Sequence, residues 1–171
     1  AWSRVSPDFM SNPAFINRGI SGQTTPQMLV RFRADVIALQ AKAVVILAGT
    51  NDIAGNTGPS TLEMISDNIQ SMAELADANG IKVIIASTLP AFDYPWKPGL
   101  EPAGKIVKLN AMIKAYAESK GHIYLDYFNE MADNRNGLKE GLGDDGVHPN
   151  KAGYAIMERL ASKAIAKALE K

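Results

Sequence analysis

The stretch DDGVHPN places a histidine three residues after a carboxylate. Asp145 and His148 have the chemistry of an orienting acid and a general base, because a carboxylate that accepts one imidazole proton fixes the tautomer of the ring. Gly146 lies between them and allows the tight turn that would bring the two side chains together. The stretch therefore predicts a histidine base, and it raises the question of which group gives up its proton.

Two other interpretations of this stretch remain open. An isolated D-x-x-H is more often a loop histidine beside solvated acids. A metal site of Asp144, Asp145 and His148 would need further ligands, and the only other histidine in the sequence is His122. His122 begins a predicted strand at the opposite edge of the sheet, where we expect it to lie on the surface.

Two more polar stretches, GTND and SGQTT, each follow an apolar run. Asn51 of GTND offers an amide N–H that stabilises a developing oxyanion without adding a charge, although all four residues are also ordinary turn residues. Gly22 of SGQTT precedes a predicted helix, where a backbone N–H faces an anion readily. Both residues are candidates for an oxyanion hole.

Ser21 offers an alternative nucleophile. The residues GISGQ resemble a G-x-S-x-G nucleophile elbow, with Gln23 at the place where the elbow has its last glycine. That departure weakens the elbow interpretation.

Apolar runs and helical patterns alternate along the chain. The predicted strands are 14–20, 43–49, 81–88 and 122–128. Such alternation predicts an α/β fold with a parallel sheet and right-handed crossovers. Groups that follow the strands of a parallel sheet gather at its carboxyl edge, so we expect the three polar stretches and the proline-rich loop at 89–102 to meet there.

The helices have recognisable ends. We expect Thr25 to cap the first helix, a Ser60–Glu63 capping box to open the second, and Asn150 to cap the last. The third helix is predicted near 103–120; the stop signals are Gly80 for the second helix and Gly121 for the third.

An aromatic, proline-rich loop spans 89–102. It carries Phe92, Tyr94 and Trp96, which either form an apolar wall for a substrate or cover the end of the sheet.

Composition limits the classes of function. The chain has 171 residues, 46% of them hydrophobic, which predicts one soluble globular domain over residues 1–171. Eighteen basic and eighteen acidic residues cancel, so no net field attracts nucleic acid or an anionic membrane. No run is long enough to span a membrane, and there are no cysteines. These features suit an exported protein as well as a cytoplasmic one.

Taken together, NRGISGQT, AGTND and DGVHPN resemble three of the four sequence blocks of the SGNH hydrolases, the GDSL lipase/esterase family. The resemblance implies a flavodoxin-like three-layer α/β/α fold. It also implies hydrolysis of a small or medium acyl ester, such as an O-acyl or lysophospholipid-type substrate, through a serine acyl-enzyme and without a cofactor or metal.

Each block assigns roles to residues of this chain. By resemblance, Gly22 gives a backbone N–H and Asn51 a side-chain N–H to the oxyanion hole. His148 is the general base and later the general acid, and Asp145 orients it. Ser21 is then a structural neighbour of the oxyanion glycine.

The family's first block, a G-D-S-like motif that ends the first strand, has no counterpart in this sequence. Trp2 resembles the residue that often follows that block. We therefore expect the nucleophilic serine and the first strand to lie upstream of Ala1, on an N-terminal piece of the same protein. The competing hypotheses are a non-catalytic binding module of the same fold and an α/β-hydrolase-like enzyme that uses Ser21.

Overall fold

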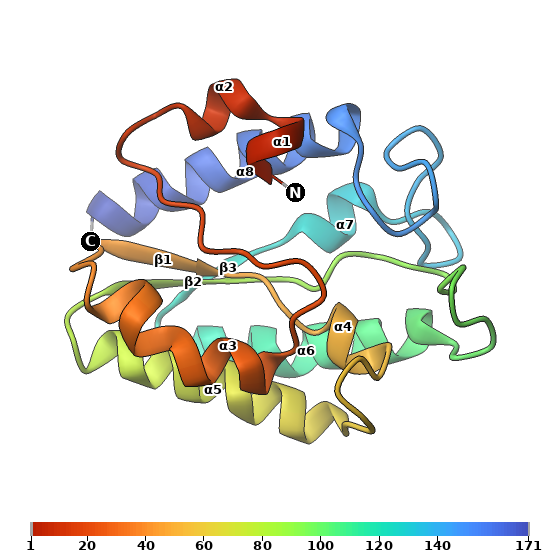
Figure 1. Cartoon of the computed structure of the whole chain (residues 1–171), viewed down its shortest axis with the longest axis horizontal. Helices are drawn as coiled ribbons and strands as arrows, with labels where there is room; N and C mark the ends of the chain where they lie inside the picture. The colour runs from red at the N-terminus through yellow and green to blue at the C-terminus, as the bar shows by residue number, and fades with distance from the viewer. Residues whose placement is uncertain (1, 171) are drawn as a thin grey trace.

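A parallel sheet lies between two layers of helices in the computed structural model, which describes residues 2–170 (Figure 1). Its strands are β1 (Ala43–Ile46), β2 (Lys82–Ala86) and β3 (Ile123–Leu125), in the order β1-β2-β3. Both pairs are parallel, with Val44 opposite Val83 and Ile84 opposite Ile123. The α/β class and the parallel sheet predicted from the sequence are confirmed.

Helices cover both faces of this sheet. The helices are α1 (Trp2–Val5), α2 (Pro7–Met10), α3 (Thr25–Phe32), the π-helix η1 (Arg33–Ile37), α4 (Thr50–Ile53), α5 (Leu62–Asp77), α6 (Pro102–Ser119), α7 (Tyr127–Met131) and α8 (Lys151–Glu170). In Figure 1, α3, α5 and α6 lie below the sheet, and α1, α2, α7 and α8 lie above it.

The two faces of β2 belong to two different cores. Val83 and Ile85 pack into the core between the sheet and the helices α5 and α6. Ile84 and Ala86 pack into the core between the sheet and α8. All four are at most 4% exposed. This two-sided burial explains why the strand is an uninterrupted apolar run without alternation.

Two helices begin one residue away from the predicted position. Thr24, and not Thr25, is the N-cap of α3, because the Thr25 hydroxyl donates to Asp52 instead. Thr61, and not Ser60, caps α5, with its hydroxyl oxygen accepting the N–H of Met64 at 3.2 Å.

The remaining helix ends agree with the sequence. Gly80 and Gly121 follow α5 and α6 with φ of +71° each, in the left-handed region that favours glycine. Asn150 caps α8: its side-chain oxygen accepts the N–H groups of Ala152 and Gly153 at 3.0 and 3.2 Å.

The predicted strand at 14–20 does not form. This segment joins α2 to α3 as irregular backbone, because it makes no sheet hydrogen bonds, and Ile16 and Ile20 are 61% and 55% exposed. An apolar run becomes a strand only when a neighbour satisfies its backbone groups.

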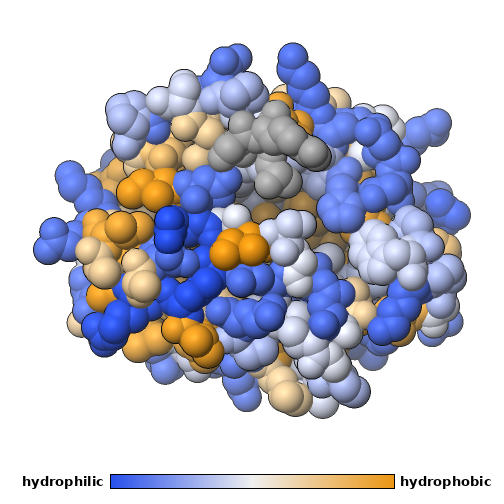
Figure 2. Space-filling model, in the orientation of Figure 1, coloured by the Kyte–Doolittle hydropathy of each residue, from blue (hydrophilic) through white to orange (hydrophobic). Residues whose placement is uncertain are grey.

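Figure 2 shows hydrophobic residues interspersed with hydrophilic ones on the face seen in Figure 1.

The last strand is shorter than predicted. It ends at Leu125, because the Asp126 carboxylate accepts the N–H of Asn129 at 3.0 Å and thereby starts α7. The expectation that His122 lies on the surface is wrong: its side chain is 6% exposed, packed against Tyr116 and 3.4 Å from Asp77.

Within residues 2–170, no helix has the length and the apolar character needed to cross a membrane.

Candidate active site

Asp145 and His148 lie in the loop before α8 and form the predicted pair. Asp145 Oδ2 is 2.7 Å from His148 Nδ1, and Asp145 Oδ1 accepts the backbone N–H groups of His148 and Val147 at 2.8 and 2.9 Å. Gly146 has a φ of +76°, which allows the turn. The carboxylate thus engages Nδ1, so that Nε2 is the nitrogen left to exchange a proton with a substrate-side group.

The surroundings of Asp145 keep it ionised. Burial alone would raise its pKa, but the hydrogen bonds from the backbone and ring of His148 and from the Val147 N–H outweigh it and hold the pKa below its usual range.

Asn51 lies in α4, the first helix after β1. Its Nδ2 donates to the backbone oxygen of Gln23 at 2.9 Å. The neighbouring Asn56 donates from Nδ2 to the Gly22 oxygen at 3.0 Å and to the Asn51 Oδ1 at 3.3 Å. An amide carries two N–H groups, so Asn51 retains one besides the bond to Gln23. The two predicted oxyanion donors, Gly22 and Asn51, are therefore held side by side.

Gln23 is itself fixed from the far side. Its Oε1 accepts Arg31 Nε at 2.7 Å, and Arg31 forms an ion pair with Asp35, which also pairs with Arg18. The two guanidinium groups hold the pKa of Asp35 below its usual range.

Asp52 is a site residue that the sequence reasoning missed. It is 2% exposed, and its carboxylate accepts the N–H and the hydroxyl of Thr25 at 2.9 and 2.6 Å. Burial raises the pKa of Asp52 although the bonds from Thr25 oppose the shift. Its position beside Asn51 gave no signal, because nothing local marks which acid of a turn will be buried.

The proline-rich loop contributes two of its three aromatic residues to this edge. Trp96 lies with its ring centroid 5.5 Å from that of His148 and stacks on Tyr94 at 5.2 Å. The Tyr94 hydroxyl donates to the Thr50 oxygen at 3.2 Å. Phe92 instead lies under the Arg135 guanidinium, 4.6 Å from it. The contacts through Trp96 and Tyr94 connect the histidine loop to α4.

The elbow interpretation of Ser21 lacks its structural context. A nucleophile elbow is a strained strand-to-helix turn, but residues 2–20 contain no strand, and Ser21 does not have a positive φ. Gly22 has the positive φ, +79°.

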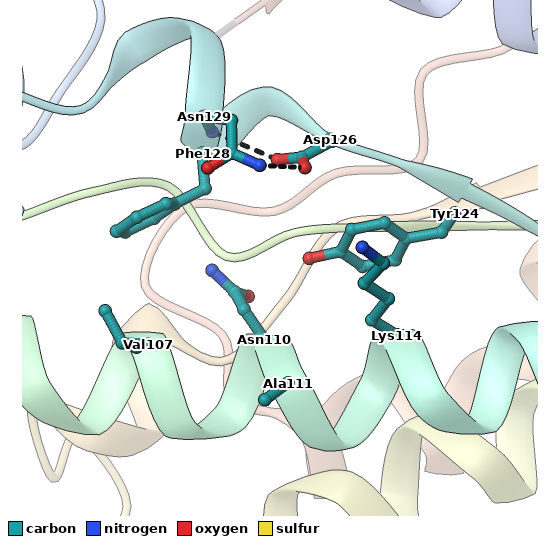
Figure 3. Close-up of a pocket in the computed structure, with 8 residues that line it drawn as sticks. All are labelled: Val107, Asn110, Ala111, Lys114, Tyr124, Asp126, Phe128 and Asn129. Carbon is teal, nitrogen blue, oxygen red and sulfur yellow. Dashed lines mark hydrogen bonds between the residues drawn. The ribbon is translucent and has the colours of Figure 1, made fainter.

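A cavity of about 180 Å³ lies away from these residues, between α6 and the end of β3. Figure 3 shows Lys114 extending from α6 toward Tyr124, whereas the side chain of Asn110 bonds the backbone of Thr88. Throughout residues 2–170, no group of three or more His, Asp or Glu side chains is arranged to hold a metal ion.

Residues 1–156 match the sequence model of the GDSL-like lipase/acylhydrolase family. The chain belongs to this family. The resemblance read from three short stretches is thereby confirmed.

Solved structures of GDSL-like proteins have the same fold over nearly the whole chain. A GDSL-like lipase from Bacteroides thetaiotaomicron is 48% identical, with a TM-score of 0.94, over 98% of this chain and 82% of that one. A protein from Bacteroides fragilis described as a candidate acylhydrolase is 47% identical, with a TM-score of 0.95 and the same coverage.

A curated relative matches over a shorter region. The uncharacterized lipoprotein YqeF of Bacillus subtilis is 32% identical over 85 residues, which is 48% of this chain. The match spans about a third (35%) of the length of that protein.

Proposed function

We propose that this chain carries the base, the orienting acid and the oxyanion hole of a serine acyl-ester hydrolase. The observation that supports this most directly is the 2.7 Å contact between Asp145 and His148 Nδ1, which leaves Nε2 for proton transfer. The bonds from Asn51 to the Gln23 oxygen and from Asn56 to the Gly22 oxygen, in a family of lipases and acylhydrolases, support it further.

The proposed reaction runs through an acyl-enzyme. A serine hydroxyl attacks the ester carbonyl carbon while His148 Nε2 takes its proton, and the carbonyl oxygen becomes an oxyanion that accepts N–H groups from Gly22 and Asn51. His148 then returns the proton to the departing alcohol as the C–O bond breaks. Water, deprotonated by the same ring, releases the acid and regenerates the serine.

The serine itself is proposed to come from a polypeptide segment outside residues 1–171. No serine of this chain stands in a G-D-S-like block. Within the described residues, β1 pairs with another strand on one side only. Three of the four apolar residues of β1 are half-buried, whereas four of the five residues of β2 are buried. An apolar strand with an open edge is suited to pair with one more strand, which would carry the serine to the edge where β1 ends.

A fluorophosphonate probe, which forms a covalent bond with activated serines, tests the proposal on the protein from its natural gene. We expect labelling that His148→Ala abolishes, and a labelled peptide, mapped by mass spectrometry, that lies outside residues 1–171. A label on Ser21 would establish the elbow instead.

The isolated chain from Ala1 to Lys171 provides the matched control. We expect it to take no label and to hydrolyse no activated ester. Absence of labelling in the whole protein as well, with ester binding retained, would show a binding module rather than an enzyme.

A further inference from the structure

The proposed base stands on an exposed loop. The His148 side chain is 67% exposed, and the side chain of its partner Asp145 is 40% exposed. A single hydrogen bond at Nδ1 leaves an imidazole ring free to tilt about that bond. An exposed imidazole therefore needs a second contact to hold Nε2 in one position.

The indole of Trp96 supplies that second contact. Its centroid lies 5.5 Å from the His148 centroid, with 34° between the ring planes. Trp96 in turn stacks on Tyr94 at 5.2 Å and 18°. Tyr94 is fully buried, so the three rings form a column that leads from the core to the exposed histidine.

The loop that carries this column is pinned to α4 and closed on itself. Lys97 Nζ donates to the Ala54 oxygen at 2.9 Å, and the Tyr94 hydroxyl donates to Thr50. The Asp93 carboxylate accepts the N–H groups of Tyr94 and Gly99 at 2.8 and 3.0 Å. These bonds fix the indole relative to the helix that carries Asn51, and hence fix the histidine relative to the oxyanion donor.

We propose that Trp96 is a positioning residue for His148. Together with the Asp145 carboxylate at Nδ1, the indole holds the imidazole ring in place. Its π face is also placed to stabilise the imidazolium that forms when the ring takes a proton. The catalytic part of this inference rests on the proposed function; the contact between the two rings does not.

Three variants of the whole protein separate positioning from substrate binding. Trp96→Leu removes the ring and keeps an apolar side chain; Trp96→Phe keeps an aromatic face; Phe92→Leu removes a half-exposed aromatic residue of the same loop that contacts Arg135 instead. We expect Trp96→Leu to lower kcat on the order of 10- to 100-fold with little change in KM, because misplacing a reacting group by about 1 Å costs up to about 100-fold. Trp96→Phe should restore most of the loss, and Phe92→Leu should behave as wild type.

A second measurement is independent of activity. A proton near the face of an indole is shielded, and the two ring centroids lie 5.5 Å apart. The NMR resonances of the His148 ring protons should therefore move toward their free-histidine positions in Trp96→Leu and much less in Trp96→Phe. Unchanged kcat, or a raised KM with unchanged kcat, in Trp96→Leu would overturn the positioning role, and so would an unmoved resonance. An inactive wild-type protein would instead refute the proposed function, and the resonance would still decide whether Trp96 holds the ring.

Discussion

The carboxylate of Asp52 receives both the backbone N–H and the hydroxyl of Thr25, at 2.9 and 2.6 Å. Asp52 follows Asn51, and Thr25 lies three positions after Gly22, so this contact joins the two halves of the proposed oxyanion hole. Asn68 adds a bond from its Nδ2 to the Thr25 hydroxyl oxygen at 3.1 Å. The relative positions of Gly22 and Asn51 thus depend on a buried acid.

The first prediction concerns the pH dependence of stability at Asp52. Burial raises its pKa above the usual 3.8, so the folded protein holds this proton up to a higher pH than the unfolded chain does. The contribution of Asp52 to the free energy of unfolding is therefore largest below the usual pKa, and falls as the pH rises through the raised value. Relative to Asp52→Asn, which does not titrate, wild type should become more stable as the pH falls from about 7 to about 4.

Urea unfolding of both proteins over this range, at constant ionic strength, measures the difference. Other carboxyl groups titrate in both proteins and cancel. A difference that shrinks as the pH falls would show that the bonds from Thr25 outweigh burial.

The second prediction concerns the base and its orienting acid. In the whole protein, His148→Ala should lower turnover of an activated ester by roughly 10³-fold or more with the melting temperature unchanged, because the exposed ring adds little to the fold. Asp145→Asn should cost less, since it only orients and stabilises the ring. The hydrogen bonds that lower the pKa of Asp145 keep this carboxylate charged in mild acid. Any loss of activity that wild type shows in mild acid should therefore also appear in Asp145→Asn. Turnover of His148→Ala within tenfold of wild type would remove His148 from the mechanism.

The third prediction separates the oxyanion role of Asn51 from its bond to the scaffold. Asn51→Ala should raise the barrier by roughly 2.7–4 kcal/mol, mostly through kcat. It should also cost about 1 kcal/mol of stability, because the bond to the Gln23 oxygen is lost. Asn56→Ala is the comparison variant: it removes the bonds to the Gly22 oxygen and to Asn51 Oδ1 but leaves the Asn51 amide in place, so its loss of kcat should be much smaller.

Turnover per folded molecule and urea midpoints should therefore diverge between the two variants. Similar stability losses with a much larger kcat loss in Asn51→Ala than in Asn56→Ala support the role. If both variants lose stability and neither loses turnover per folded molecule, Asn51 belongs to the scaffold.

The sequence predicted the sheet and the edge where the site lies, because both follow from local patterns. Uninterrupted apolar runs mark strands covered on both faces, and the cap at Asn150 is a contact between near neighbours in the chain. The run at 14–20 misled because its apolar character says nothing about whether a neighbouring strand satisfies its backbone.

Contacts between distant residues account for the other differences. Thr25 has the right chemistry for an N-cap, but Asp52 takes its hydroxyl, and Thr24 caps α3 instead. The loop aromatics left two interpretations open, and only the fold brings Trp96, rather than Phe92, beside His148. No local pattern contains these pairings.

The fourth prediction tests how tightly the turn after β1 is packed. Gly49 has a φ of +110°, and a Cβ there would lie 2.7 Å from Leu109 Cδ2 and 2.8 Å from Thr88 Oγ1. Neither neighbour yields easily, since Leu109 and Thr88 are at most 1% exposed and the Thr88 hydroxyl donates to the Ala48 oxygen at 2.7 Å. Gly58 has nearly the same φ, +105°, with nothing within 4 Å of its Cβ position.

The two glycines therefore separate backbone strain from steric overlap. Gly58→Ala should lose about 1–2 kcal/mol of stability, from the left-handed backbone alone. Gly49→Ala should lose about 1–3 kcal/mol more, because the extra methyl group overpacks a closed core. Because Gly49 lies two residues before Asn51, the folded fraction of Gly49→Ala should also lose turnover. The folded fraction of Gly58→Ala should keep it. Equal unfolding free energies for the two variants would mean that the core beneath Gly49 relaxes, and that the close approach there does not fix the position of Asn51.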